Sequence, residues 1–287
     1  MNLDDLGKIL TLERFRDPPP VVAVIPLAGV IGRLGPVRRG LSLAGLASMI
    51  ERAFKLRRLA AVALAVNSPG GSPVQSALLA KRIRDLADEK DVPVYAFAED
   101  VAASGGYWLA LAADEIYADA NSVIGSIGVV SGGFGFTQAI KRLGIERRLH
   151  TAGDRKAMLD PFRPEKASDV RHLEGLQRDI HDSFKAQVLE RRGARLKANH
   201  KELFSGAFWT GARALEMGLI DGLGDMRGVL RGKFGERVRL KRVSPVEPLW
   251  RRFGLPGADA PRPAPGDWAA TAIAAVEERL LWNRFGL

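Results

Sequence analysis

Short apolar strands and amphipathic helices alternate along the first half of the chain, and this alternation constrains the fold more than any other feature. Runs with little or no charge that read as strands cover residues 21–27, 59–66 and 92–97. Apolar residues at helical spacing fill the intervals between them, over 41–56 and 74–86. Strands joined by helices pair in parallel, with the helices packed on the faces of the sheet. The sequence therefore predicts an α/β fold built on a parallel sheet.

The same pattern continues further along the chain. A short apolar helix is expected over 106–113, a strand over 114–118, and a glycine-rich strand that ends in a loop over 122–135. A long amphipathic helix follows over 168–191, with a highly charged polar face. After a last helical stretch at 212–217, we expect the ordered core to end near two glycines, Gly222 and Gly224.

The chain divides into four parts by composition. We expect an N-terminal leader over 1–20, a folded main domain over 21–243, a proline-rich extended linker over 244–266 and an amphipathic helix over 267–287. The terminal helix is expected to pack on the body or on a neighbouring subunit. Peripheral docking on a membrane surface is the alternative.

The formal net charge of +10 makes nucleic acid or anionic lipid a partner to consider. The densest basic stretches, at 191–192, 195–201 and 227–242, are not interleaved with exposed-looking aromatic residues of the kind that stack on bases. We interpret them as solvated faces and expect no nucleic-acid partner. The absence of cysteine excludes disulfides, thiolate metal sites and a cysteine nucleophile.

The first twenty residues contain acids and no apolar run long enough for a signal peptide or a membrane anchor. We therefore expect a cytoplasmic protein, with peripheral contact at the inner face of the membrane if the C-terminal helix binds lipid.

Two glycine-rich turns follow buried strands. One is Ser68-Pro69-Gly70-Gly71, and the other is Ala102-Ala103-Ser104-Gly105-Gly106-Tyr107. Ligands of parallel α/β sheets bind beyond the carboxyl ends of strands, and consecutive glycines let backbone N–H groups face an oxyanion. Ser104 is thus a candidate nucleophile at a sharp turn into a helix. By spacing alone, a packed turn of small residues is an equally good interpretation.

A serine nucleophile needs a base, and histidine is the usual one. The four histidines are His150, His172, His181 and His200, and none has an obvious acidic partner or metal-ligand spacing with acids. The sequence therefore supports neither a Ser–His–Asp triad nor a metal site. Lysine can replace histidine as the base if burial keeps its amine neutral.

Five ordered motifs resemble the signal peptide peptidase A family of the peptidase S49 type, and together they span roughly residues 21–230. They are Asn67-Ser68-Pro69-Gly70-Gly71, Ala103-Ser104-Gly105-Gly106-Tyr107, Gly125-Ser126-Ile127-Gly128-Val129, Gly153-Asp154-Arg155-Lys156 with Pro161-Phe162, and Phe208-Trp209-Thr210-Gly211 with Ala214 to Asp221.

The resemblance implies the repeated β-β-α units of the Clp protease/crotonase-like superfold, with a C-terminal helical extension. It implies a serine endopeptidase that cleaves extended apolar peptides, such as signal peptide remnants, through an acyl-enzyme and without cofactor or metal. The implied site has Ser104 as nucleophile, Lys156 as general base, Gly71 and Gly105 as oxyanion donors and Ser126 orienting the lysine. It also implies a homo-oligomeric ring in which each chain supplies both Ser104 and Lys156.

Three alternatives stay open. A crotonase-like enzyme would bind acyl-CoA in the same oxyanion hole and use a carboxylate base, for which Glu99 and Asp100 are the nearby acids. A non-catalytic scaffold on a membrane surface would depend on the terminal helix and the positive charge. A related Ser–Lys family cleaves near stomatin-type membrane proteins, and substrate profiling would separate it.

Overall fold

The computed structural model describes residues 18–34, 38–244 and 267–287, and its centre is one mostly parallel sheet. The strand order is β10-β1-β4-β5-β6-β9, and all neighbours along this path run parallel. The predicted α/β fold with parallel pairing is confirmed. These strands are β1 (Val21–Ala28), β4 (Leu59–Ser68), β5 (Val94–Ala103), β6 (Glu115–Ala118), β9 (Gly222–Leu223) and β10 (Arg239–Arg242).

Strand β5 is longer than its apolar run predicts, and its two halves have different neighbours. Its first half pairs with β6, whereas Val101 to Ala103 pair with β7 (Val123–Gly125). On its other side, β7 pairs antiparallel with β8 (Phe208–Thr210). This pairing brings Gly125 and the residues after it beside the end of β5. A separate antiparallel ribbon joins β2 (Arg33–Leu34) and β3 (Arg38–Arg39).

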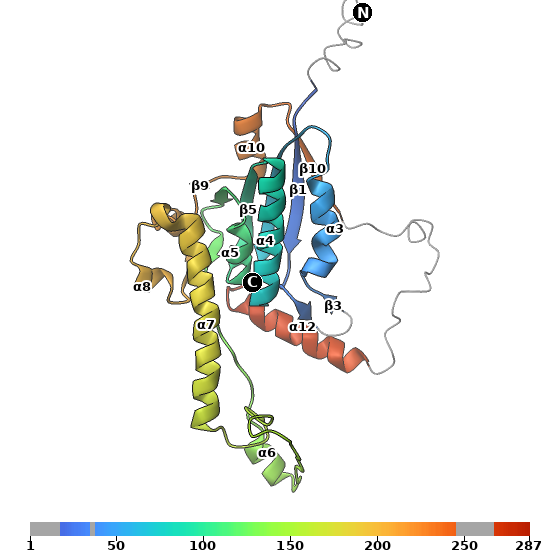
Figure 1. Ribbon diagram of the computed structural model, residues 1–287, viewed down its shortest axis with the longest axis vertical. Coiled ribbons are helices and arrows are strands. Elements are labelled where there is room, and N and C mark those ends of the chain that lie inside the picture. The colour runs from blue at the N-terminus through green and yellow to red at the C-terminus, as the bar shows by residue number, and fades with distance from the viewer. Residues whose placement is uncertain (1–17, 35–37, 245–266) are drawn as a thin grey trace, which may run out of the picture.

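Helices cover both faces of the sheet (Figure 1). One face packs against α3 (Leu43–Ala53), α4 (Pro73–Lys90), α5 (Gly105–Ala110) and the C-terminal part of α7 (Ala167–Arg192), and the other face packs against α10 (Met226–Phe234). Serine side chains accept backbone N–H groups at the starts of α3 and α4, Ser42 from Gly45 and Ser72 from Gln75. The helices therefore begin where the sequence supplies a capping oxygen.

Four shorter helical segments and one terminal helix complete the helices in the described parts of the chain. They are α6 (Thr137–Arg142), the 3₁₀ turn η1 (Gly193–Arg195), α8 (His200–Leu203), α9 (Gly211–Glu216) and α12 (Asp267–Asn283). Helix α12 lies below the carboxyl ends of the strands in Figure 1. After it, the Phe285 ring packs edge-on against Phe208 of β8, with 5.0 Å between centroids.

The expectation that the core ends near Gly224 is wrong. Helix α10 buries Leu230 completely, and Val243 is buried after β10, which pairs in parallel with β1 at the edge of the sheet. The basic stretch 227–242 is therefore part of the fold and not only a solvated face. Its charge concealed the strand, because an edge strand is held by backbone hydrogen bonds along one side while most of its side chains stay in water.

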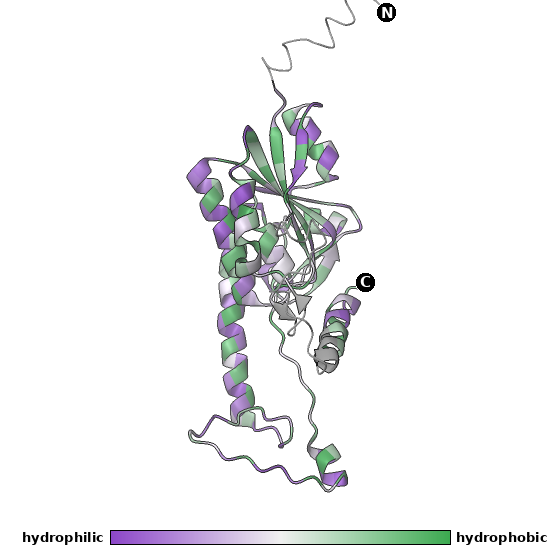
Figure 2. Cartoon of the chain, turned by 90° about the vertical axis from the view of Figure 1, so that its right-hand side faces the viewer, coloured by the Kyte–Doolittle hydropathy of each residue, from purple (hydrophilic) through white to green (hydrophobic). Residues whose placement is uncertain are grey.

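Residues 130–166 form an extension that we call the arm. It carries α6 and lies at the far end of α7, well away from the sheet (Figure 1). Most of its residues are exposed, including Val130, Phe134 and Leu143, whose exposed fractions are 70%, 77% and 72%. Figure 2 shows that apolar residues are concentrated in the strands of the sheet, whereas polar and apolar residues alternate along α7. The body is thus close-packed, and the arm is open to solvent.

Candidate active site

Ser104 lies at a sharp turn between the end of β5 and the start of α5. Its φ of +52° and ψ of −122° are strained for a residue with a side chain. The Ser104 N–H donates to the Gly125 carbonyl at 2.8 Å, and the Trp108 N–H donates to the Ser104 carbonyl at 3.0 Å. From Val101 to Ala113, Ser104 is the one residue that is not buried. The fold thus leaves this serine accessible at a strand-to-helix turn, as the nucleophile of a serine hydrolase requires.

The other glycine-rich turn touches this serine. Gly70 has a φ of +105°, and a Cβ atom placed on it would lie 2.7 Å from the Ser104 Cβ and 2.9 Å from the Gly105 nitrogen. A Cβ atom on Gly105 would lie 2.4 Å from the Ser76 hydroxyl oxygen and 3.4 Å from the Gly70 Cα. Real Cβ atoms do not come within 3.0 Å of other atoms, so the first turn can meet the Ser104 turn only because residue 70 is glycine. Glycine at position 105 leaves room for the Ser76 hydroxyl of α4.

Gly71 and Gly105 are the predicted oxyanion donors. Ile31 pairs with the first turn through the Gly70 carbonyl and the Ser72 N–H, both at 2.8 Å, so the Gly71 N–H takes no part in that pairing. The Gly105 N–H follows Ser104 directly. The structure brings the two turns together, and the role of their N–H groups in catalysis stays a prediction.

Ser126 follows β7 and also has a left-handed backbone, with φ of +52°. Its N–H donates to the Ala207 carbonyl at 2.7 Å, and the residue is 4% exposed. The residue before it, Gly125, accepts the Ser104 N–H. Two strained serines therefore directly follow the ends of the neighbouring strands β5 and β7, and the hydrogen bond from Ser104 to Gly125 links these two strand ends.

Lys156 lies elsewhere in the chain. It is exposed in a turn of the arm, where its N–H donates to the Gly153 carbonyl at 3.2 Å. Since the arm lies at the far end of α7, a single chain does not bring Lys156 to Ser104 or Ser126 (Figure 1). Its role as general base stays a prediction.

The arm has its own polar and aromatic contacts. The Arg147 side chain pairs with Asp160 at 3.0 Å and lies over the Phe162 ring, 4.9 Å from its centroid. The Phe162 N–H donates to the Asp160 carboxylate at 3.1 Å. This hydrogen bond and Arg147 hold the pKa of Asp160 below its ordinary value. The arm therefore has defined local structure although it lacks a buried core.

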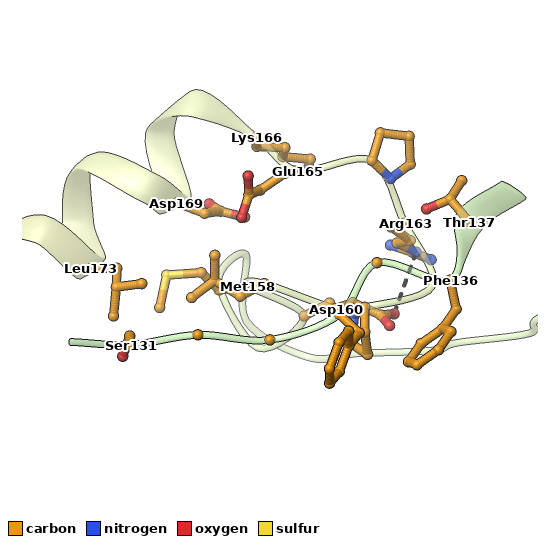
Figure 3. Close-up of a pocket in the computed structure, with 18 of the residues that line it drawn as sticks. Ser131, Phe136, Thr137, Met158, Asp160, Arg163, Glu165, Lys166, Asp169 and Leu173 are labelled. Atoms are coloured by element: carbon orange, nitrogen blue, oxygen red, sulfur yellow. Dashed lines mark ion pairs between the residues drawn. The ribbon is translucent and has the colours of Figure 1, made fainter. Parts of the chain in front are cut away.

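A hollow of about 890 Å³ lies between the arm and the start of α7. Figure 3 shows Met158 and Leu173 on its apolar side and the Asp160–Arg163 ion pair on its polar side. It is separate from the Ser104 turn, because none of the residues that line it belongs to β5 or α5.

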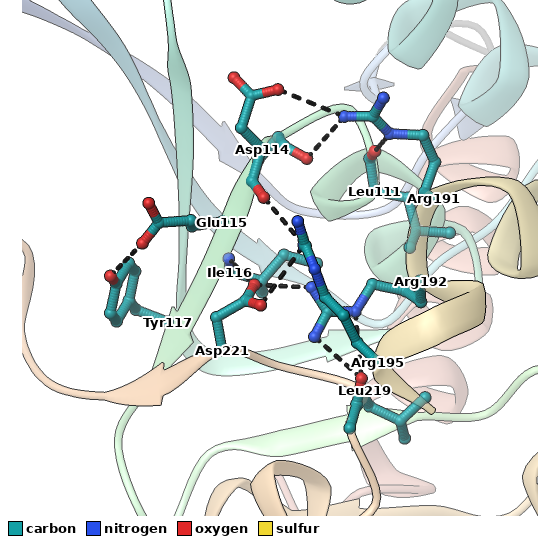
Figure 4. Close-up of polar contacts among 12 residues, drawn as sticks. Leu111, Asp114, Glu115, Ile116, Tyr117, Arg191, Arg192, Arg195, Leu219 and Asp221 are labelled. Atoms are coloured by element: carbon teal, nitrogen blue, oxygen red, sulfur yellow. Dashed lines mark hydrogen bonds and ion pairs between the residues drawn. The ribbon is translucent and has the colours of Figure 1, made fainter. Parts of the chain in front are cut away.

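Arginines at the C-terminal end of α7 attach this helix to the sheet (Figure 4). Arg192 is 2% exposed, donates twice to the Gly218 carbonyl and pairs with Asp221 at 2.6 Å. Arg191 donates to the Leu111 and Ala113 carbonyls at 3.0 and 2.9 Å. The interpretation of 191–192 as a solvated basic face is therefore wrong. No sequence pattern signals these partners, since they are carbonyls of distant loops.

The helix behind Ser104 is fixed by two aromatic side chains. The Tyr107 hydroxyl donates to the Leu219 carbonyl at 2.7 Å, and burial raises the pKa of this phenol. Trp108 stacks on Phe184 of α7, with 4.5 Å between ring centroids. Both residues are buried in the core, and they attach α5 to α7 and to the α9–β9 loop.

The other candidate bases lie in different surroundings. His150, His172 and His200 are exposed. Glu99 and Asp100 are exposed too, and the Asp100 carboxylate accepts from the Asn67 side chain at 2.7 Å. Among the residues that the structure describes, no histidine and no carboxylate makes a hydrogen bond to the Ser104 side chain.

A serine on a strained turn at the carboxyl end of a central parallel strand, facing a second glycine turn, is the arrangement in which α/β hydrolases present a nucleophile, and the mostly parallel sheet is consistent with the Clp-protease-like fold. The sequence model of peptidase family S49 matches residues 87–233. The chain therefore belongs to peptidase family S49, as its motifs indicated. This membership favours a peptidase over an acyl-CoA enzyme.

Curated relatives include proteins of different names. The chain is 31% identical to the chloroplastic serine protease SPPA of Arabidopsis thaliana, over 79% of this chain and 34% of that protein. It is 32% identical to a putative signal peptide peptidase SppA of Enterococcus faecium, over 57% of this chain and 47% of that protein. It is 49% identical to a Brucella abortus protein named Na(+)/H(+) antiporter NhaA, over 99% of this chain and 39% of that protein.

The chain thus spans well under half the length of the Brucella protein that it matches over nearly all its own residues. Within the described parts of the chain, no helix has the length and apolar character needed to cross a bilayer.

Proposed function

We propose that this chain is a serine endopeptidase with a Ser–Lys dyad, in which Ser104 is the nucleophile and Lys156 the general base. Its substrates are extended apolar peptides or unfolded polypeptides, such as signal peptide remnants. The observation that carries the proposal is the Ser104 turn, where an accessible serine in a buried segment meets Gly70 at van der Waals contact.

The chemistry follows that of other serine peptidases. The neutral amine of Lys156 takes the Ser104 proton while the hydroxyl oxygen attacks the peptide carbonyl. The N–H groups of Gly71 and Gly105 donate to the oxyanion that forms, and the lysine returns the proton to the departing amine. Water then attacks the acyl-enzyme with the same lysine as base, which releases the acid product and frees Ser104. Because only the neutral amine can accept the proton, kcat/KM is expected to rise on the alkaline side.

We further propose that the lysine reaches a serine across a subunit interface in a homo-oligomer. The arm that carries Lys156 projects from the body and exposes large apolar side chains, among them Phe134 and Leu143. Such side chains favour burial against another surface. Contact with a neighbouring body would also desolvate the amine, which favours its neutral form. In this arrangement each chain contributes both residues, but to different sites.

Hydrolysis of a quenched apolar peptide by wild type, Ser104→Ala and Lys156→Ala tests the dyad. Both variants are expected to lose activity by about 10³-fold or more. Lys141→Ala is the matched control, because Lys141 is another exposed lysine of the arm and is expected to keep wild-type rates. Full activity in Ser104→Ala would refute the proposal. Binding of acyl-CoA by an inactive wild type would favour the crotonase-like alternative.

A cytoplasmic location with peripheral membrane contact remains part of the proposal. Helix α12 exposes Ile273, Val276 and Leu280, with exposed fractions of 61%, 59% and 54%. Residues at this spacing lie along one side of a helix and could enter a lipid surface. Flotation with liposomes, with and without residues 244–287, tests this contact. Equal flotation of both proteins would refute it.

A further inference from the structure

Helix α7 changes its surroundings halfway along its length. Its C-terminal part is packed into the body, where Phe184 is 2% exposed and Val188 is fully buried. Its N-terminal part leaves the body and leads to the arm, with Leu176 and Ile180 exposed to 46% and 37%. His181 lies at the boundary between the two parts, and it is half-buried.

The His181 side chain contacts the main chain next to the candidate active site. Its Nε2 atom lies 3.1 Å from the Ile127 carbonyl oxygen. A carbonyl oxygen can only accept a hydrogen bond, so Nε2 is the donor in this contact. The sequence did not indicate this partner of His181, because Ile127 lies more than fifty positions away in the chain.

The contact lies at one end of a short chain of main-chain hydrogen bonds. Ile127 follows Ser126, whose N–H donates to the Ala207 carbonyl at 2.7 Å. Gly125 precedes Ser126 and accepts the Ser104 N–H at 2.8 Å. Ser126 is thus held on its N-terminal side by a backbone carbonyl and on its C-terminal side by a side chain. Of these hydrogen bonds, the one from His181 is the only one donated by a side chain, so a substitution can remove it without changing the backbone.

The hydrogen bond from His181 matters because the backbone of both serines is strained. Ser104 and Ser126 both have φ values of +52°, a conformation that persists only where surrounding contacts over-determine it. Release of the Ile127 carbonyl would let the 125–128 segment relax, which would turn the Ser126 hydroxyl and shift the acceptor of the Ser104 N–H. The nucleophile would then spend less time in its reactive orientation.

We propose that His181 is a positioning residue of this peptidase. By donating to the Ile127 carbonyl it holds Ser126, and through Gly125 it holds Ser104, in the strained conformations that catalysis needs. It acts through these residues and does not touch the peptide. The inference rests on the proposed function and deepens it.

Three variants of α7 separate the roles of this side chain. His181→Leu keeps an apolar side chain of similar size without the donor, and kcat is expected to fall about 10-fold with KM within about twofold. His181→Gln puts an amide N–H at about the reach of Nε2 and is expected to recover most of kcat. His172→Leu is the matched control, an exposed histidine on the same helix, and should behave as wild type.

Thermal unfolding distinguishes positioning from plain stabilisation. Val188→Ala removes buried side-chain volume about two turns further along α7 and leaves the His181 donor in place. Positioning predicts that His181→Leu loses more kcat than Val188→Ala at an equal or smaller drop in Tm. The proposal is overturned if kcat follows Tm across the variants, if His181→Gln is as slow as His181→Leu, or if His181→Leu is fully active.

Ser104→Ala in the same assay keeps the two proposals apart. Activity that survives in Ser104→Ala would refute the peptidase assignment whatever the histidine variants do. Activity that is lost in Ser104→Ala and unchanged in His181→Leu would refute only the role of His181.

Discussion

The Ser104 turn and the arm that carries Lys156 differ in almost every physical respect. The turn lies among buried residues and has main-chain hydrogen bonds to Gly125 and Trp108. Gly70 stands where the neighbouring turn approaches it. The arm is mostly exposed, and glycines such as Gly132 and Gly133 have open space where a Cβ atom would lie. Contacts within one chain therefore fix the conformation of the proposed nucleophile, whereas the surroundings of the proposed base depend on what covers the arm.

This difference bears directly on the chemistry. A serine needs an exact orientation, which close packing supplies. A lysine needs a neutral amine, which desolvation supplies. The fold of a single chain packs closely around the Ser104 turn and leaves Lys156 exposed to water.

The largest effect is expected from mixing two inactive proteins. If Lys156 serves the Ser104 of a neighbour, Ser104→Ala and Lys156→Ala subunits that exchange should restore about a quarter of wild-type activity, because that share of interfaces pairs two intact residues. Peptide hydrolysis after co-refolding measures it. A mixture as inactive as its components, with mixed oligomers shown by mass spectrometry, would place both residues of a working dyad in one chain.

Next in size is the contrast between a buried and an exposed arginine. Arg192→Ala is expected to cost about 3 kcal/mol of unfolding free energy, since it takes from the Gly218 carbonyl its two guanidinium donors and from Asp221 its buried cation. Asp221 then keeps Arg195 and the Ile116 N–H. Arg148→Ala, in the exposed arm pair with Glu146, should unfold as wild type does. Urea unfolding measures both. Equal stability of the two variants would contradict the assignment of Arg192 as the attachment of α7.

Two glycine substitutions compare the regions most directly. Gly70→Ala places a Cβ atom 2.7 Å from the Ser104 Cβ at a φ of +105°, and we expect a loss of about 2–4 kcal/mol together with most of the activity. Gly132→Ala meets nothing within 4 Å and should be neutral in stability. Chemical unfolding and peptide hydrolysis measure the pair. An active, stable Gly70→Ala protein would show that the two turns do not need to touch.

The smallest effect is expected on the stability of the arm at acid pH. The pKa of Asp160 is lower in the folded arm than in an unfolded chain, mainly through the Phe162 N–H and then through Arg147. The ionised carboxylate therefore stabilises the arm above its unfolded pKa, and this stabilisation is lost as the pH falls through the lowered value. Hydrogen exchange between pH 5 and pH 3 should show the arm opening before the sheet. Asp160→Asn should remove most of the pH dependence from the protection factors of the arm, which are exchange rates corrected for the intrinsic effect of pH.

The sequence predicted most of the body and little of the arm. Uninterrupted apolar runs identified β1, β4 and β5, and the glycine-flanked Ser104 turn was found where the structure has it. Strand β10 was missed, because Arg239 and Lys241 resemble solvated residues and an edge strand is held by its backbone. The pairing of β7 with β8 was missed as well, since its partners are more than eighty residues apart in the chain.

What the sequence by itself determined is local: where strands and helices begin, which turns need glycine, and which serine stands at a strand-to-helix turn. The spacing of apolar residues and the steric limits of the backbone act over a few residues, so they can be predicted directly from the sequence. The tertiary structure alone decided that Arg192 is buried, that His181 meets the Ile127 carbonyl, and that Lys156 lies on an arm away from Ser104. Those outcomes depend on which distant surfaces pack together, and no single stretch of sequence contains that information.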